Sequence, residues 1–192
     1  MTFGGLAFAA APGKVMVPRP ASEQVVAAAA EILRDRRSPR VVDVGTGSGA
    51  IALGLAAEIP HARIFATDTN PAAVALAGTN AARLGLDGRV TVLHGDLLEP
   101  VPGTVDLIAA NLPYLPAAAA VGHPELAGEP PEAVFAPGDG LGPYRRLLAA
   151  SRERLAPDGA LVIQFRRRAL AAGRDELDAL AARVPGFFAA AA

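Results

Sequence analysis

The sequence contains no cysteine and no long uninterrupted apolar run. Without cysteine the chain has no disulfides, no thiolate metal ligands and no cysteine nucleophile, which suits a reducing compartment, and we expect a cytoplasmic protein. No stretch reaches the roughly 18 apolar residues that a membrane span needs. The apolar start, Met1 to Pro12, lacks a basic region and is broken by Gly4 and Gly5. It therefore predicts a surface strand or hairpin rather than a secretion signal.

The sequence also lacks an excess of either charge. Lys and Arg total 18 and Asp and Glu total 19, so the formal net charge is -1. No overall field draws such a chain to nucleic acid or to an anionic membrane, and any binding of that kind would have to be local. The three histidines, His61, His94 and His123, share no helical spacing and stand near no clustered carboxylates. No metal site is expected.

What the chain does have is an alternation of short β-branched runs with alanine-rich stretches. Its 192 residues, 52% of them hydrophobic, are enough for one well-buried domain and few for two. The alternation is typical of an α/β fold with a doubly wound, mostly parallel sheet. The predicted strands are Arg40–Val44, Arg63–Thr67, Val90–Leu93, Val105–Ala109 and Ala160–Phe165. The predicted helices are Ser22–Arg36, Gly49–Glu58, Pro71–Leu84, Pro143–Leu155 and Ala169–Arg183.

One helix boundary and two irregular regions complete this prediction. Asn70 and Pro71 suit the N-cap and first position of a helix, and Gly85 suits its C-terminal end. The segment from Asn111 to Gly142 is long and rich in Pro and Gly, so it predicts a functional or disordered loop after the carboxyl end of a strand, where open α/β sheets bind ligands. The end of the chain, Pro185 to Ala192, offers no strand pattern and is expected to be frayed or helical.

A glycine-rich turn follows the first predicted sheet strand, in Val41-Val42-Asp43-Val44-Gly45-Thr46-Gly47-Ser48-Gly49. Glycines at this point let the backbone turn sharply and approach a ligand closely. The spacing G-x-G-x-G departs from the G-x-G-x-x-G dinucleotide fingerprint. Backbone donors of the turn, Thr46 and Ser48 included, can face a carboxylate, while Asp43 can meet an ammonium group directly or through water. S-adenosylmethionine carries such a zwitterionic tail.

Two further carboxylates follow the next two predicted strands. Asp68, with Thr69 and Asn70 after it, ends the second strand, and its two oxygens can accept both hydroxyls of a ribose. Asp96 follows the third strand, where it can accept from the exocyclic amine of an adenine while Leu97 packs on the ring. Taken singly, either Asp is equally well explained as a helix cap or turn residue. The ordered set predicts a bound adenosyl cofactor.

The tetrapeptide Asn111-Leu112-Pro113-Tyr114 follows the fourth strand and indicates the reaction type. An amide or aromatic amine is a poor nucleophile because its nitrogen lone pair is delocalised. The Asn111 side-chain oxygen and the Leu112 carbonyl can accept both of its N–H groups and aim the nitrogen at a sulfonium methyl group, so catalysis is positioning and electrostatics. Tyr114 can stack on the planar group. In isolation the tetrapeptide would be explained as a polar turn in which Pro113 breaks the strand.

The chain resembles the S-adenosylmethionine-dependent protein glutamine methyltransferases of the release-factor type. The similar segments are Pro18-Arg19-Pro20 with Ser22-Glu23, Val42-Asp43-Val44-Gly45-Thr46-Gly47-Ser48-Gly49, Asn111-Leu112-Pro113-Tyr114, Glu129-Pro130-Pro131-Glu132-Ala133-Val134 and Gly138-Asp139-Gly140-Leu141. The resemblance implies the Rossmann-like fold of class I methyltransferases. It also implies methyl transfer to the side-chain amide of a glutamine in a protein, with release factors as the best-known acceptors.

Three departures from that family bear on function. Leu112 replaces the first proline of the family's Asn-Pro-Pro-Tyr, but residue 112 still precedes Pro113, which keeps it extended. Only a short stretch, residues 1–21, precedes the predicted methyltransferase domain of residues 22–192, in place of the family's N-terminal helical domain; we expect it to enter the active site. The family's closing strands are barely present. The sheet is therefore expected to be abbreviated at its C-terminal edge, or to be completed there by a second copy or a partner subunit.

Three functional hypotheses remain open at this stage. The first is methylation of a glutamine side-chain amide in a protein, with a translation release factor as the predicted partner. The second keeps the cofactor but takes a small metabolite or a nucleic-acid base amine, since Asn-x-Pro-Tyr presents the same two acceptors to adenine; the near-neutral charge argues against nucleic acid. The third is a cofactor-binding subunit that is inactive without a partner.

Overall fold

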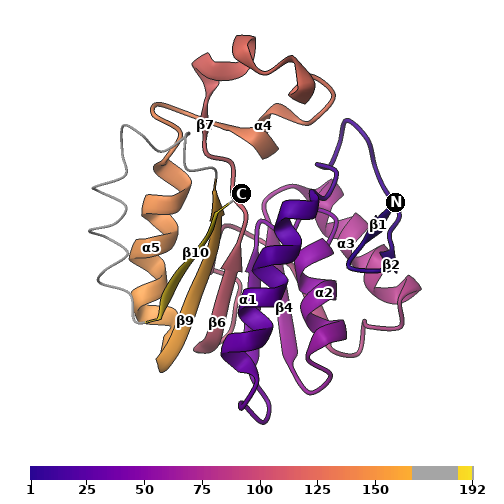
Figure 1. The fold of residues 1–192 in the computed structure, drawn as a ribbon, viewed down its shortest axis with the longest axis vertical. Coiled ribbons are helices and arrows are strands. Elements are labelled where there is room, and N and C mark those ends of the chain that lie inside the picture. The colour runs from indigo at the N-terminus through magenta and orange to yellow at the C-terminus, as the bar shows by residue number, and fades with distance from the viewer. Residues whose placement is uncertain (166–185, 192) are drawn as a thin grey trace.

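The computed structural model describes residues 1–165 and 186–191 of the chain. Its centre is a parallel sheet of six strands in the order β10-β9-β6-β3-β4-β5, with helices on both faces (Figure 1). The strands are β3 (Arg40–Val44), β4 (Arg63–Asp68), β5 (Val90–His94), β6 (Val105–Ala110), β9 (Leu155–Phe165) and β10 (Phe187–Ala191). The covering helices are α1 (Glu23–Leu33), α2 (Ala50–Glu58), α3 (Pro71–Arg83) and α5 (Gly142–Arg154).

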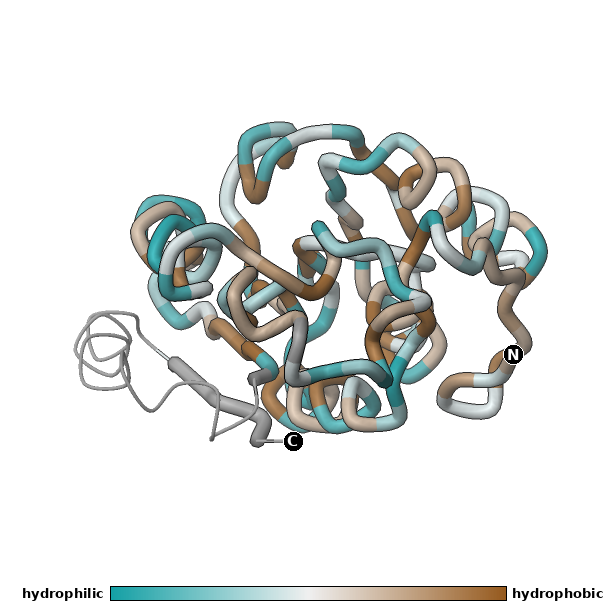
Figure 2. The backbone as a smooth tube through the Cα atoms, turned by 90° about the horizontal axis from the view of Figure 1, so that it is seen from above, coloured by the Kyte–Doolittle hydropathy of each residue, from teal (hydrophilic) through white to brown (hydrophobic). Residues whose placement is uncertain are grey.

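Alternate residues of each strand belong to two different cores. Val41 of β3 lies in the core that α1, α2 and α3 cover, whereas Val42 and Val44 lie in the core that α5 covers. Because successive side chains of a strand point to opposite faces, a strand buried on both sides reads as a continuous apolar run. Seen from above, hydrophobic (brown) and hydrophilic (teal) stretches are interspersed along the tube (Figure 2).

The strand order reverses at β3. The chain passes from β3 through β4 to β5 on one side of the sheet and then returns to place β6 on the other side of β3. Since the strands are parallel, the carboxyl ends of β3 and β6 open a crevice at this switch point, where such sheets bind ligands. The glycine-rich turn after β3 and the tetrapeptide after β6 meet there.

Two small parts lie above and beside the sheet. The upper segment, residues 111–142, passes over the carboxyl ends of the strands (Figure 1). It contains β7 (Leu115–Pro116), two 3-10 helices (Ala117–Gly122 and Pro124–Leu126), α4 (Pro131–Val134) and β8 (Phe135–Ala136). Near the N-terminus, β1 (Thr2–Phe3) and β2 (Leu6–Ala7) form an antiparallel pair, and a 3-10 helix (Pro20–Ser22) leads into α1. The predicted N-terminal hairpin is confirmed.

Most predicted elements are confirmed. The five predicted strands correspond to β3, β4, β5, β6 and β9, and the Asn70 side chain caps α3 by accepting from the Ala72 N–H at 2.9 Å. The predicted helix Ala169–Arg183 lies outside the described residues. Along the described chain, no helix is both long and apolar enough to cross a membrane.

Of two predictions about irregular regions, the first is wrong, and the second is right about the position of the segment at the cavity but wrong about its irregularity. The C-terminal segment from Pro185 was expected to be frayed or helical, but Phe187–Ala191 forms β10 and pairs in parallel with β9. Backbone pairing with an existing edge extends strand structure over the three closing alanines, which have little strand propensity of their own. The segment from Asn111 to Gly142 is also not a plain loop, because β7 and β8 pair and Leu115, Leu126 and Val134 form a small core with Met16.

Candidate functional site

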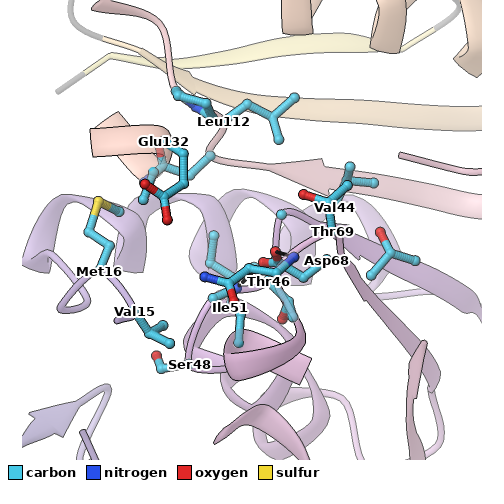
Figure 3. Close-up of a pocket in the computed structure, with 18 of the residues that line it drawn as sticks. Val15, Met16, Val44, Thr46, Ser48, Ile51, Asp68, Thr69, Leu112 and Glu132 are labelled. Carbon is cyan, nitrogen blue, oxygen red and sulfur yellow. Dashed lines mark hydrogen bonds between the residues drawn. The ribbon is translucent and has the colours of Figure 1, made fainter. Parts of the chain in front are cut away.

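A cavity of about 440 Å³ lies at the carboxyl ends of β3, β4 and β6. Figure 3 shows side chains converging on it from the N-terminal segment, the glycine turn, the end of β4 and the upper segment. The predicted site residues that line it are Gly45, Thr46, Gly47, Ser48, Asp68, Thr69, Asn70, Asp96, Leu97, Asn111, Leu112 and Pro113. Asp43, Gly49 and Tyr114 are not among its lining residues.

The glycine turn brings β3 into contact with the tetrapeptide. Gly45 has a φ of +71°, in the left-handed region, and its N–H and that of Thr46 both donate to the Thr67 carbonyl at 2.9 Å. A Cβ atom on Gly45 would lie 2.7 Å from Cδ2 of Leu112. A side chain here would therefore be strained and would also collide with Leu112.

Asp43 lies beneath this turn rather than in the cavity. Its Oδ2 accepts from the Thr46 hydroxyl at 2.6 Å and from the Ala52 N–H at 3.1 Å, so it ties the turn to the start of α2. Its Oδ1 is buried and has no hydrogen-bond partner among the described residues. Burial raises the pKa of Asp43 from 3.8 to about 7. Contact of this carboxylate with a ligand's ammonium group stays a prediction.

Asp68 connects two walls of the cavity. Its Oδ2 accepts from the Gly47 N–H and its Oδ1 from the Asn70 N–H, each at 2.9 Å. Asn70 in turn donates through Nδ2 to the Lys14 carbonyl at 3.0 Å, which holds the N-terminal segment over the cavity. Each Asp68 oxygen keeps a free lone pair for a ligand hydroxyl.

Asp96 and Leu97 form the wall after β5. Asp96 pairs with Arg146 of α5, and both line the cavity. Leu97 has a φ of +47° and is the one non-glycine residue with positive φ among those described. Its carbonyl accepts from the Thr67 hydroxyl at 2.8 Å, which helps to hold this strained backbone.

The tetrapeptide is held from below by residues of three other elements. The Asn111 Nδ2 donates to the Ser22 hydroxyl at 3.0 Å, and that hydroxyl donates to the Gln164 Oε1 at 2.7 Å. The Leu112 N–H donates to the Tyr144 hydroxyl at 3.1 Å. The ring of Tyr114 lies 6.5 Å from the ring of Tyr144, centroid to centroid, so stacking of Tyr114 on a substrate stays a prediction.

Glu129 joins the upper segment to the N-terminal segment. Its Oε2 accepts from the Val17 N–H and its Oε1 from Arg19 Nη2, each at 3.1 Å. Glu132 lies nearby at the cavity wall, and its side chain is exposed (Figure 3). The family-like segments around Arg19 and Glu129 are therefore in direct contact, although they lie 110 residues apart in the chain.

Glu132 lines the cavity, as one of the two equally weighted interpretations of its segment predicted. Sequence reasoning did miss Tyr144, Gln164 and Arg146, which either line the cavity or hold residues that do. Gln164 had one local signal, because it is a polar residue at the end of the apolar strand run Ala160-Leu161-Val162-Ile163. The others look like ordinary helix residues, and only the fold places them at the site.

A family model, the methyltransferase small domain, matches residues 24–123. Among curated proteins, the chain is 46% identical over 153 residues to the release factor glutamine methyltransferase of Deinococcus radiodurans, covering 79% of this chain and 54% of that protein. It is 45% identical over 165 residues to the protein of the same name from Moorella thermoacetica, covering 85% of this chain and 58% of that protein. The chain thus spans just over half the length of these relatives.

Solved structures agree on the fold. A ribosomal protein L11 methylase from Lactobacillus delbrueckii subsp. bulgaricus superposes with a TM-score of 0.56 at 23% identity, covering 78% of this chain and 62% of that chain. Such a likeness shows a shared Rossmann-like architecture and nothing about the acceptor. The comparisons confirm the resemblance predicted from the sequence, and with a family model that covers more than half of its residues, the chain belongs to the methyltransferase small domain family.

Proposed function

We propose that this chain uses S-adenosylmethionine to methylate the side-chain amide nitrogen of a glutamine in a protein, with translation release factors as the acceptor class. One observation supports this above the others. Asn111 and Leu112 line the cavity side by side, and the Asn111 NH₂ group is already bonded to Ser22. The Asn111 oxygen and the Leu112 carbonyl are thus the groups offered to a substrate, and two acceptors suit a planar NH₂ group.

The residues present fit the proposed cofactor. The first N–H groups of α2 have no partner within the helix, and Ala50 and Ile51 line the cavity beside Gly47, so backbone donors are available for a carboxylate. The absence of side chains at Gly45 and Gly47 keeps the backbone open to a ligand. Asp68 and Asp96 supply acceptors for a ribose and an adenine amine. When bound, S-adenosylmethionine supplies a methyl group activated by its sulfonium.

The chain's contribution to the reaction is then orientation. Asn111 Oδ1 and the Leu112 carbonyl accept the two N–H groups of the glutamine amide. These two hydrogen bonds orient the amide plane so that one face of the nitrogen points into the cavity. As positive charge builds on that nitrogen, the same two oxygens stabilise it. The nitrogen gains the methyl group and loses one proton to water. No strongly basic side chain is required for that loss, because the N–H becomes acidic as the new bond forms.

Mass spectrometry of a methylated peptide tests this proposal. The purified chain is incubated with methyl-labelled S-adenosylmethionine and a peptide with one glutamine, and with a matched peptide in which glutamate replaces that glutamine. We expect label on the glutamine side chain and none on the glutamate peptide. Label on both peptides, or on neither while a small amine is labelled, would contradict the assignment.

The same assay distinguishes two alternatives. The Asn-x-Pro-Tyr arrangement also suits an adenine amine, which predicts labelling of a DNA or RNA oligonucleotide and binding that weakens steeply with salt. The second alternative is a cofactor-binding subunit that is inactive without a partner. Activity on the peptide by the chain alone would exclude the second alternative. The division at residue 21, the oligomeric state and the cytoplasmic location stay predictions.

A further inference from the structure

We infer that Ser22 is a positioning residue that sets the direction of the Asn111 side-chain amide, and that Gln164 anchors both acceptor groups of the site. The inference rests on the proposed function, because it explains how the acceptor pair is held. Ser22 lines the cavity, whereas Gln164 and Tyr144 are absent from its wall and act through the residues that they hold.

With the Gln164 side-chain oxygen facing Ser22, as in the structure, the direction of each hydrogen bond follows from the number of protons available. A serine hydroxyl has one proton, and Ser22 gives it to the Gln164 Oε1 at 2.7 Å. The Ser22 oxygen is then left as an acceptor, and it meets the Asn111 amide at 3.0 Å. If the Asn111 amide were turned over, two acceptor oxygens would face each other without a proton between them. The NH₂ group of Asn111 is therefore held at Ser22, and its oxygen is left for the substrate.

The backbone half of the acceptor pair is held in the same way. The Tyr144 hydroxyl accepts the Leu112 N–H at 3.1 Å and lies 2.6 Å from the Gln164 carbonyl but 3.2 Å from the Leu112 carbonyl. Its single proton suits the shorter contact, which leaves the lone pairs of the Leu112 carbonyl for a substrate. Burial raises the pKa of the Tyr144 hydroxyl far above its ordinary value, so this proton stays in place.

Both tethers end on Gln164 at the end of β9. Its side-chain oxygen holds Ser22 and its main-chain oxygen holds Tyr144. Ser22 and Gln164 are each 4% exposed, so these bonds are largely shielded from bulk water. Gln164 thereby holds the Asn111 side chain and the Leu112 backbone in place relative to each other. A site that accepts both N–H groups of a planar amide needs its two acceptor oxygens fixed in this way.

The first test removes the Ser22 hydroxyl. In Ser22→Ala the Asn111 amide loses its directing partner, and we expect kcat for the glutamine peptide to fall about 10- to 100-fold, with the Kd of S-adenosylmethionine unchanged. Ser22→Thr keeps the hydroxyl and is expected to restore most of the turnover. Ser151→Ala is the matched control, because Ser151 is also buried but bonds to the Leu148 carbonyl inside α5 at 2.9 Å. Full turnover in Ser22→Ala would overturn the inference.

A double variant separates positioning from general stability. If Ser22 acts only through Asn111, Ser22→Ala in an Asn111→Ala background is expected to cause no further loss of turnover. Equal losses in both backgrounds would show that Ser22 acts by another route and would overturn the inference.

An NMR measurement tests whether Ser22 orients the Asn111 amide and does not depend on an activity assay. In the ¹⁵N-labelled full chain, the Asn111 side-chain NH₂ signals, assigned with Asn111→Asp, are expected to shift in Ser22→Ala and to stay in place in Ser151→Ala. If wild-type protein methylates no glutamine, the proposed function fails while these shifts still test the network. Unchanged Asn111 signals in Ser22→Ala would overturn the inference whatever the activity.

Discussion

The two halves of the cavity are built in different ways. The cofactor half comes from consecutive β-to-α turns, with Asp43, Gly45 and Asp68 bonded to residues of their own turn or the neighbouring strand. The acceptor half joins Ser22, Asn111 and Gln164. Asn111 lies 89 residues after Ser22 in the sequence, and Gln164 lies 142 residues after it. The first half follows from local sequence, whereas the second exists only once the sheet is assembled.

The halves also differ in charge. The cofactor half contains three carboxylates, of which Asp43 is buried with a pKa raised to about 7 by that burial. The bonds of the acceptor half are made by amides and hydroxyls, all neutral between pH 4 and 8. A change of pH, or the removal of a single charge, should therefore affect the cofactor half and leave the acceptor half unchanged.

The response of stability to pH is the largest expected difference. The folded-state pKa of Asp43, about 7, lies above the ordinary 3.8, so between these values the folded chain keeps a proton that the unfolded chain releases. The contribution of Asp43 to the free energy of unfolding is thus complete below pH 3.8 and is lost as the pH rises to about 7. We expect a slope of up to about 1.4 kcal/mol per pH unit.

Urea unfolding from pH 4 to 8 measures this slope. Asp43→Asn removes the titrating group but keeps an oxygen for Thr46 and Ala52, so its profile should be flatter than that of the wild type over this range. Parallel profiles for the two proteins would show that Asp43 titrates as an ordinary aspartate.

Removal of the acceptor side chain is the next largest effect. Asn111→Ala deletes one of the two oxygens proposed to bind the glutamine amide, and kcat is expected to fall about 10²- to 10³-fold. The Kd of S-adenosylmethionine, measured by calorimetry, should stay within about twofold because the other cofactor contacts do not change. A large loss of cofactor affinity in this variant would mean that the two halves are not separable.

The reverse result is expected for Asp68. Asp68→Ala removes the acceptor for two backbone N–H groups and for the proposed ribose, so the Kd of S-adenosylmethionine should rise about 10- to 100-fold. At saturating cofactor, kcat for the peptide should change far less than in Asn111→Ala. A fall in kcat with unchanged cofactor affinity would place Asp68 on the acceptor side.

The smallest effect tests the contact between the halves. Gly45→Ala and Gly85→Ala both put a Cβ atom on a residue with positive φ, +71° and +67° respectively. The Cβ atom at position 45 meets Leu112, whereas the Cβ atom at position 85 has no neighbour within 4 Å. The positive φ costs each variant about 1–2 kcal/mol of unfolding free energy, and the contact with Leu112 should add about 1–2 kcal/mol to Gly45→Ala. Thermal unfolding measures both; equal losses would show that Leu112 gives way freely.

The contrast between local and long-range contacts also explains which features could be predicted from the sequence. The strands, the Asn70 cap and the glycine turn follow from patterns of a few residues, and the structure contains each of them. Tyr144 carries no such pattern, and Gln164 has only its polarity at the end of an apolar run, because the roles of both depend on β9 lying beside β6. β10 was missed for a related reason, since its three closing alanines form a strand by pairing with β9 rather than by propensity.

A crystal structure of the chain with S-adenosylhomocysteine and a glutamine peptide tests the central claim most directly. We expect the adenosyl group between Asp68 and Asp96, and the glutamine NH₂ within hydrogen-bond distance of both Asn111 Oδ1 and the Leu112 carbonyl, with the Asn111 NH₂ still bonded to Ser22. A glutamine amide bound away from Asn111, or an Asn111 amide turned over, would contradict it.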